Sequence, residues 1–144
     1  DQPEESRAVE WVAYASNAFN TMVPFYANVE RTPEYLANTT GTVSTDNFYW
    51  TSRLIAAMAD ASYNKSLFHL ERYEEAVLSE ARALVNQYDA KLAAEPDAAR
   101  RAALREEANT AIAAMLQEKA ADTLDKVLFE LSSQMKNAYS RSDA

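Results

Sequence analysis

The sequence predicts an α+β fold that is predominantly α-helical. Its 144 residues include a single glycine, Gly41, which leaves few left-handed turns and favours long helices with few connections. Residues 67–144 are rich in Ala, Glu and Arg and repeat apolar residues at helical spacing. Residues 11–60 differ, because they hold most of the aromatic side chains. We therefore expect a short part that contains strands, followed by a helical scaffold.

Two extended segments are predicted near the start of the chain. In residues 8–15 both alternating sets of side chains include apolar residues, and Trp, Val and Tyr favour strands, so we expect a strand that is covered on both faces. Residues 16–20 are mostly polar and predict a turn. Residues 21–26 predict a second, shorter strand, and Pro24 makes it an edge or irregular strand because proline cannot donate a ladder hydrogen bond.

Helical signals begin after these strands. Thr32 and Pro33 have the residue types of an N-cap and a first helical position, so a short helical turn is expected through Ala37. Residues 44–46 offer three possible N-caps for a helix over residues 48–63. Its predicted apolar stripe consists of Trp50, Leu54, Ile55, Met58 and Ala61. The polar residues 64–66 are expected to end that helix.

Two long helices follow. The first is expected over residues 67–94 and the second over about 97–139, with Pro96 in the first turn of the second. Apolar residues recur three or four positions apart in both, and a short break between two such helices predicts an antiparallel helical hairpin. The apolar positions are Leu70, Tyr73, Val77, Ala81, Leu84, Tyr88 and Leu92, then Leu104, Ala108, Ile112, Leu116, Ala120, Leu124, Val127, Leu131 and Met135. We expect one part at residues 1–66 and a hairpin part at residues 67–144.

Composition excludes several function classes. The net charge of −8 disfavours nucleic acid and anionic membranes as partners. No apolar run approaches the roughly 18 residues that span a bilayer, so no membrane partner is expected. The absence of Cys excludes a disulfide framework and a thiolate metal site, and we expect no cofactor. A chain that begins at Asp1 without an initiator Met is expected to be a fragment, and a cytoplasmic location is expected, with export of the parent left open.

The titratable residues give little sign of a catalytic cluster. His69 is the only histidine, and the position three before it, Ser66, is not the carboxylate that a di-iron Glu-x-x-His pair needs. No Ser lies in a G-x-S-x-G nucleophile elbow. The interleaved Glu, Arg and Lys residues of the long helices are expected to form a solvated face. We therefore predict no metal site.

Two polar residues remain as candidates for a site. Arg53 lies seven positions before Asp60 and one turn after Tyr49, so the three share a helix face beside the apolar stripe. An exposed Arg on an ordinary amphipathic helix is the alternative. Asn17 follows the first strand, where its amide could donate to an oxyanion, although most Asn residues in such positions only form turns.

The runs WVAYASNAFNTMVPFYANVERTPEYLANTT and STDNFYWTSRLIAAMADASY closely resemble the C-terminal part of the dipeptidase A family of cysteine dipeptidases, over residues 9–75. The resemblance implies an αββα N-terminal-nucleophile hydrolase sandwich that hydrolyses dipeptides without a metal. This chain would supply one or two strands and one layer helix. The hairpin would pack on the sandwich or mediate homo-oligomer assembly.

The same resemblance implies an autoprocessed N-terminal Cys as nucleophile, and this chain has no Cys. The fragment alone is therefore expected to be inactive, with no catalytic residue of its own. By distant similarity to choloylglycine hydrolases and penicillin V acylases, Asn17 and Arg53 are expected to line the oxyanion or substrate site. The alternative is a non-enzymatic helical module for interaction or oligomerisation.

Overall fold

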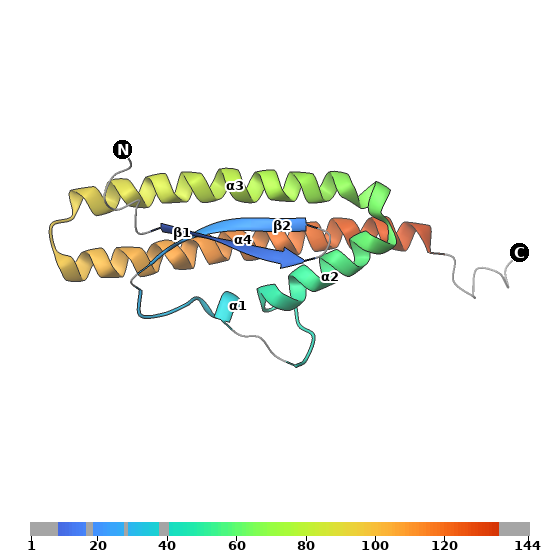
Figure 1. Ribbon diagram of the computed structural model, residues 1–144, viewed down its shortest axis with the longest axis horizontal. Coiled ribbons are helices and arrows are strands. Elements are labelled where there is room, and N and C mark those ends of the chain that lie inside the picture. The colour runs from blue at the N-terminus through green and yellow to red at the C-terminus, as the bar shows by residue number, and fades with distance from the viewer. Residues whose placement is uncertain (1–8, 17–18, 28, 38–40, 136–144) are drawn as a thin grey trace, which may run out of the picture.

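The computed structural model describes residues 9–16, 19–27, 29–37 and 41–135, and within the two strands it leaves the side chains of residues 13–16 and 19–21 undescribed. Figure 1 shows two long helices side by side, a strand hairpin that lies along them, and a shorter helix beside the second long helix. Two strands and mostly helical residues confirm the predicted α+β, predominantly α, fold class.

The strands are β1 (Val9–Ser16) and β2 (Phe19–Tyr26), and they pair antiparallel with a register that runs from Val9 opposite Tyr26 to Ser16 opposite Phe19. Both predicted strands are confirmed, with the second starting two residues earlier than expected. Residues 17 and 18 connect them and lie outside the described residues. An unbroken register contains no bulge, so side chains alternate regularly between the two faces of the hairpin.

Burial differs between the strands in a way that the sequence did not predict. In β2, Val23 and Tyr26 lie on opposite faces, because they are three positions apart, and yet both are buried. In β1, Trp11 is 41% exposed and Glu10 is also exposed. The prediction that the first strand is covered on both faces is therefore wrong. The strand that is covered on both faces is β2, because it contacts both long helices.

The helices are α1 (Glu34–Ala37), α2 (Phe48–Ala61), α3 (Tyr63–Ala94) and α4 (Ala98–Gln134). The short turn, the two long helices and their antiparallel pairing are confirmed, and α4 ends five residues before the expected Tyr139. Asp97 caps α4 by accepting from the Arg100 amide at 3.0 Å, so Pro96 precedes the helix rather than lying in its first turn.

Three details of α2 correct the sequence analysis. Its N-cap is Asn47, whose side chain accepts from the Trp50 amide at 2.9 Å, and not one of residues 44–46. The chain breaks at Ser62, so residues 64–66 belong to α3. Its buried face is rotated from the predicted stripe, and it includes Thr51, whose hydroxyl donates to the Asn47 carbonyl at 2.8 Å. The buried residues are Phe48, Thr51, Ser52, Ile55 and Ala59.

The core has two clusters that lie on either side of β2. The larger joins Val23 to residues of α1, α2, α3 and α4, among them Ile55, Val77 and Leu116. The smaller joins Tyr26 to Tyr88, Leu92 and Ala108. Both clusters draw on residues from before and after position 66. The division of the chain into parts 1–66 and 67–144 stays a prediction.

Candidate functional site

Arg53 lies on the exposed face of α2, opposite the buried residues that fix this helix. Its guanidinium carbon is 5.3 Å from the centre of the Tyr49 ring, one turn earlier. The Tyr49 ring in turn meets the Trp50 ring edge-on at 5.2 Å. The aromatic pair therefore supports the cation from one side, in a stacking contact that suits a planar guanidinium.

Arg53 is an exposed residue of α2. Among the described residues no ion pair engages its guanidinium, although Asp60 lies on the same helix face as the sequence predicted. Seven residues of helix separate the two by about 10 Å, which is too far for a contact. A guanidinium with free N–H donors can bind a carboxylate or another anion in a bidentate manner. The site role of Arg53 stays a prediction.

Asn17, the other predicted site residue, lies outside the described residues. It belongs to the connection between β1 and β2. Its proposed role at an oxyanion stays a prediction.

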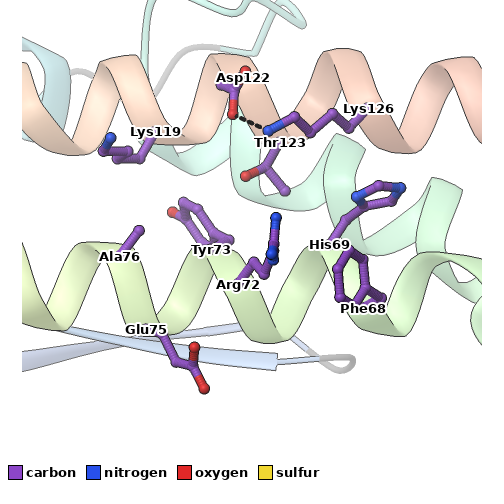
Figure 2. A pocket seen from close by; sticks show the side chains of 10 residues that line it. All are labelled: Phe68, His69, Arg72, Tyr73, Glu75, Ala76, Lys119, Asp122, Thr123 and Lys126. Atoms are coloured by element: carbon purple, nitrogen blue, oxygen red, sulfur yellow. Dashed lines mark hydrogen bonds and ion pairs between the residues drawn. The ribbon is translucent and has the colours of Figure 1, made fainter.

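A cleft of about 520 Å³ lies between α3 and α4 and is lined mainly by charged and polar side chains (Figure 2). Lys126 donates to Asp122 at 2.7 Å, and Lys119 lies 2.9 Å from Glu80, whose hydrogen bond raises the pKa of Lys119. The Arg72 guanidinium stacks 4.6 Å from the centre of the Phe68 ring. These basic side chains therefore already have partners within the hairpin.

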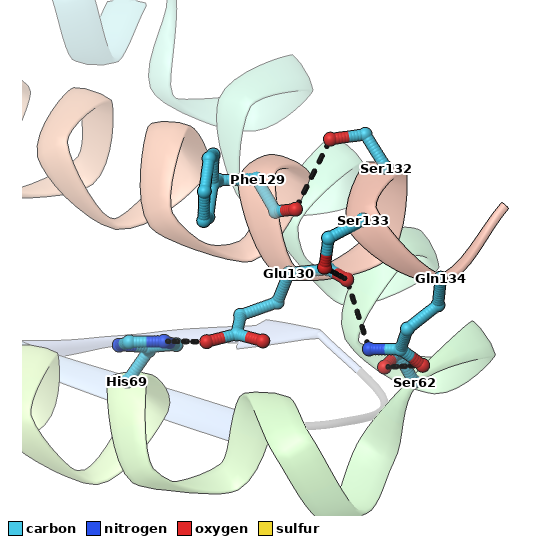
Figure 3. Close-up of polar contacts among 7 residues, drawn as sticks. All are labelled: Ser62, His69, Phe129, Glu130, Ser132, Ser133 and Gln134. Carbon is cyan, nitrogen blue, oxygen red and sulfur yellow. Dashed lines mark hydrogen bonds and ion pairs between the residues drawn. The ribbon is translucent and has the colours of Figure 1, made fainter.

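His69 lies at one end of this cleft, and its Nε2 atom is 3.4 Å from Glu130 of α4 (Figure 3). Within the part of the chain that the structure describes, its ring bonds to no hydroxyl group. A His–Glu pair without a nucleophile holds two helices together but cannot start an acyl transfer. The nearby bond from the Ser62 hydroxyl to Gln134 at 3.2 Å likewise joins the start of α3 to the end of α4.

A polar network that the sequence analysis missed fixes β2 to both long helices. Oδ1 of Asn109, in α4, accepts from the Tyr26 amide at 2.7 Å, and its Nδ2 donates to the Tyr26 carbonyl at 3.0 Å. The Tyr26 hydroxyl donates to Asp89 of α3 at 2.7 Å. Burial, together with Asp89, raises the pKa of Tyr26 well above its usual value. The signal available in the sequence was a polar Asn directly beside Ala108, one of the predicted apolar positions of the second long helix.

Among the described residues, no group of three or more His, Cys, Asp or Glu side chains lies close enough to hold a metal ion. No helix among them carries an apolar stretch long enough to cross a lipid bilayer.

A profile of peptidase family C69 matches residues 1–76, which is more than half of the chain. The chain is 41% identical over 143 residues to a probable dipeptidase A of Streptococcus pyogenes serotype M18, and this covers 99% of the chain and 29% of the relative. It is 35% identical over 179 residues to a dipeptidase of Bifidobacterium longum, with 99% and 34% covered. The chain thus spans about a third of these relatives.

Proposed function

Because this chain belongs to peptidase family C69, we propose that it is one part of a dipeptidase whose remaining part supplies the catalytic nucleophile. The observation that carries the proposal is the 41% identity to a probable dipeptidase A, which extends over nearly the whole chain. An identity of this extent includes α3 and α4, so the helical hairpin belongs to the same protein type as the aromatic-rich first half. The substrate proposed for the complete enzyme is a dipeptide.

The nucleophile is the main missing component. The 144 residues contain no Cys, and a thiolate is the strongest nucleophile at neutral pH among protein side chains. We infer that the chain alone does not hydrolyse dipeptides. The larger share of each matched relative lies outside the aligned region, which leaves room for the nucleophile.

Within this enzyme, Arg53 is proposed to bind substrate and Asn17 to stabilise the oxyanion of the tetrahedral intermediate. A dipeptide carries a free carboxylate, and the guanidinium of Arg53 presents unpaired N–H donors on a ring-supported side chain. Asn17 would contribute a neutral amide donor, which is suited to an oxyanion that develops in the transition state. No metal or cofactor is required by this chemistry.

A chimera tests the proposed function. The matched region of the Streptococcus pyogenes dipeptidase A is replaced by these 144 residues, and hydrolysis of a panel of dipeptides is measured for the chimera and for the isolated chain. The proposal expects turnover by the folded chimera and none by the isolated chain. A folded chimera without activity contradicts the proposal, and so does turnover by the isolated chain.

A non-enzymatic role in assembly is the second candidate. Phe129 is 72% exposed on α4 and Phe68 is 56% exposed on α3, and large apolar side chains at such exposure favour contact with another protein surface. We propose that the intact protein is a homo-oligomer that uses this end of the helical hairpin. Its cytoplasmic location and its lack of nucleic-acid partners also stay predictions, which cell fractionation and a nucleic-acid binding assay would check.

A further inference from the structure

Arg72 places a guanidinium in the cleft between α3 and α4. The group stacks 4.6 Å from the centre of the Phe68 ring, one helical turn earlier. Figure 2 shows the side chain directed from α3 toward Thr123 and Lys126 of α4, and all four residues line the cleft. A ring contacts the face of the guanidinium and uses none of the N–H donors in its plane, so these donors stay available in the cleft.

No carboxylate neutralises Arg72 among the residues that the structure describes. Glu75 lies three positions later, a spacing at which a helix commonly forms an ion pair. Figure 2 shows the Glu75 carboxylate directed away from α4, whereas the Arg72 guanidinium is directed toward it. The chain has 22 acidic residues against 14 basic ones, and this cation still has none as a partner. The guanidinium is therefore available to an anion from outside the chain.

Two groups on α4 supply further donors to the same cleft. Thr123 is 4% exposed, and its hydroxyl forms no hydrogen bond within the described part of the chain. A buried hydroxyl without a partner costs free energy, and a bound acceptor would remove that cost. Lys126, three positions later, donates to Asp122 at 2.7 Å and has three N–H donors in total. Arg72, Thr123 and Lys126 thus present donors from two helices.

The charges around the cleft favour one class of anion. Lys119 lies 2.9 Å from Glu80. Lys126 lies 2.7 Å from Asp122, so each lysine already faces a carboxylate. Arg72 is left with one unneutralised positive charge, which matches a monoanion better than a dianion. A planar guanidinium forms two parallel hydrogen bonds with a carboxylate, so both the charge and the geometry favour a monocarboxylate over phosphate.

We propose that this cleft binds the carboxylate group of a small monocarboxylate, with Arg72 as the main donor and the hydroxyl of Thr123 as a second donor. Its volume of about 520 Å³ lies within the range of small-molecule sites. Phe68 holds the guanidinium before the anion arrives, which lowers the entropy lost on binding. The inference does not depend on the proposed function, because binding is measured without any dipeptide hydrolysis.

An NMR titration of the isotope-labelled chain tests the proposal, with acetate as the probe and with chloride and inorganic phosphate compared at matched ionic strength. The Nε–H signal of Arg72 is identified by its absence from Arg72→Gln. We expect acetate to shift this signal to saturation, with a half-saturating concentration at least about tenfold below that of chloride. Equal responses to acetate and chloride overturn the proposal. Half-saturation by phosphate at a lower concentration than by acetate also overturns it, because the cleft then prefers another class of anion.

Substitutions test the two donors separately, with the backbone amide signals of the cleft as the readout. Arg72→Gln should weaken acetate binding at least about tenfold, because it removes a charge-assisted contact. Thr123→Val keeps the shape of the side chain without the hydroxyl and should weaken acetate binding about two- to tenfold. Arg82→Gln, at an exposed position of α3, is the matched control and should bind acetate like the unsubstituted chain. Full acetate affinity in Arg72→Gln overturns the proposal.

The chimera described above extends the test to a complete protein. The same titration should give a similar half-saturating concentration of acetate for the chimera and for the isolated chain. Loss of acetate binding in a folded chimera overturns the proposal, because another part of the protein then fills the cleft. The proposed function is judged by dipeptide hydrolysis alone, so the failure of one proposal leaves the other intact.

Discussion

Asn109 of α4 binds both backbone polar groups of Tyr26 of β2, at 2.7 Å from the amide and 3.0 Å from the carbonyl. The side-chain amide thus substitutes for a neighbouring strand at the end of β2. Both residues are buried, Tyr26 at 2% exposure and Asn109 also at 2%, so no water replaces this contact. The two hydrogen bonds join residues that are 83 positions apart in the sequence, and they fix the strand hairpin against the helical hairpin.

Replacement of Asn109 by Ala should destabilise the protein strongly. The Tyr26 amide and carbonyl would be left buried without partners, and each unsatisfied group costs about 1–3 kcal/mol, so we expect a loss of about 2–5 kcal/mol. Chemical denaturation monitored by circular dichroism measures this. Asn86→Ala, at an exposed position of α3, is the matched control and should change the unfolding free energy by less than about 0.5 kcal/mol. Equal effects of the two substitutions would contradict a structural role for the Asn109 contact.

Alkaline pH should destabilise the protein through its buried tyrosines. Burial raises the pKa of Tyr35 to about 12 and raises that of Tyr26 further. An unfolded tyrosine has a pKa of about 10, so above that pH the unfolded chain releases a proton that the native protein retains, and the unfolded state is favoured. This stabilisation is complete below pH of about 10 and is lost as the pH rises toward 12.

The variant Tyr35→Phe isolates the contribution of Tyr35 to this loss of stability at alkaline pH. It removes the titrating group, so the unfolding free energy should fall less steeply above pH of about 10 than in the unsubstituted protein, by about 1–2 kcal/mol at the alkaline end. Denaturation curves at a series of pH values measure the slope. Parallel curves for the two proteins would show that Tyr35 ionises equally easily in both states.

The parts of the fold that follow from local spacing were predictable from sequence. Apolar steps of three and four placed Leu70, Val77 and Ala81 correctly on the buried face of α3, because a helix face needs no information from distant residues. The strand pattern and Pro24 located β2 for the same reason. The break at Ser62 was not predictable, since Ser66, in the polar segment expected to form the break, is instead a fully buried residue of α3.

The candidate site depends more strongly on tertiary structure. Sequence placed Arg53 on a helix face with Tyr49, and the ring contact follows from that spacing. Which strand is covered on both faces depends instead on residues distant in sequence, because β2 contacts both long helices and Asn109 of α4 binds the backbone of Tyr26. The Cys nucleophile proposed above could not be located from this sequence, because none of the 144 residues is a Cys.

The exposed phenyl group of Phe129 should contribute to self-association of the intact protein. At 72% exposure its removal costs little within one chain, so Phe129→Ser should leave the melting temperature nearly unchanged. In the chimera it should shift the sedimentation profile toward the monomer, because the loss of an apolar contact weakens an interface between copies. Ala121→Ser, also exposed on α4, is the matched control. An unchanged profile for Phe129→Ser would assign the oligomer contact elsewhere.

Substitution of Arg53 should distinguish a role in substrate binding from a role in folding. Its exposed ring contact with Tyr49 is worth about 0.5–1 kcal/mol, so Arg53→Ala should leave the fold intact. If its guanidinium binds the substrate carboxylate, the same change in the chimera should lower kcat/KM by about 10–100-fold, corresponding to a charge-assisted contact of about 1.5–3 kcal/mol. Arg53→Lys keeps the positive charge but lacks the planar guanidinium, so its kcat/KM should lie between that of Arg53→Ala and that of the unsubstituted chimera. Arg82→Ala, at an exposed position of α3, is the matched control and should retain full turnover.

The substrate gives a second test of Arg53. The loss of kcat/KM in the Arg53→Ala chimera should appear for dipeptides with a free carboxylate and should shrink for C-terminally amidated ones. An equal loss of kcat/KM for both substrates would reject carboxylate binding by Arg53.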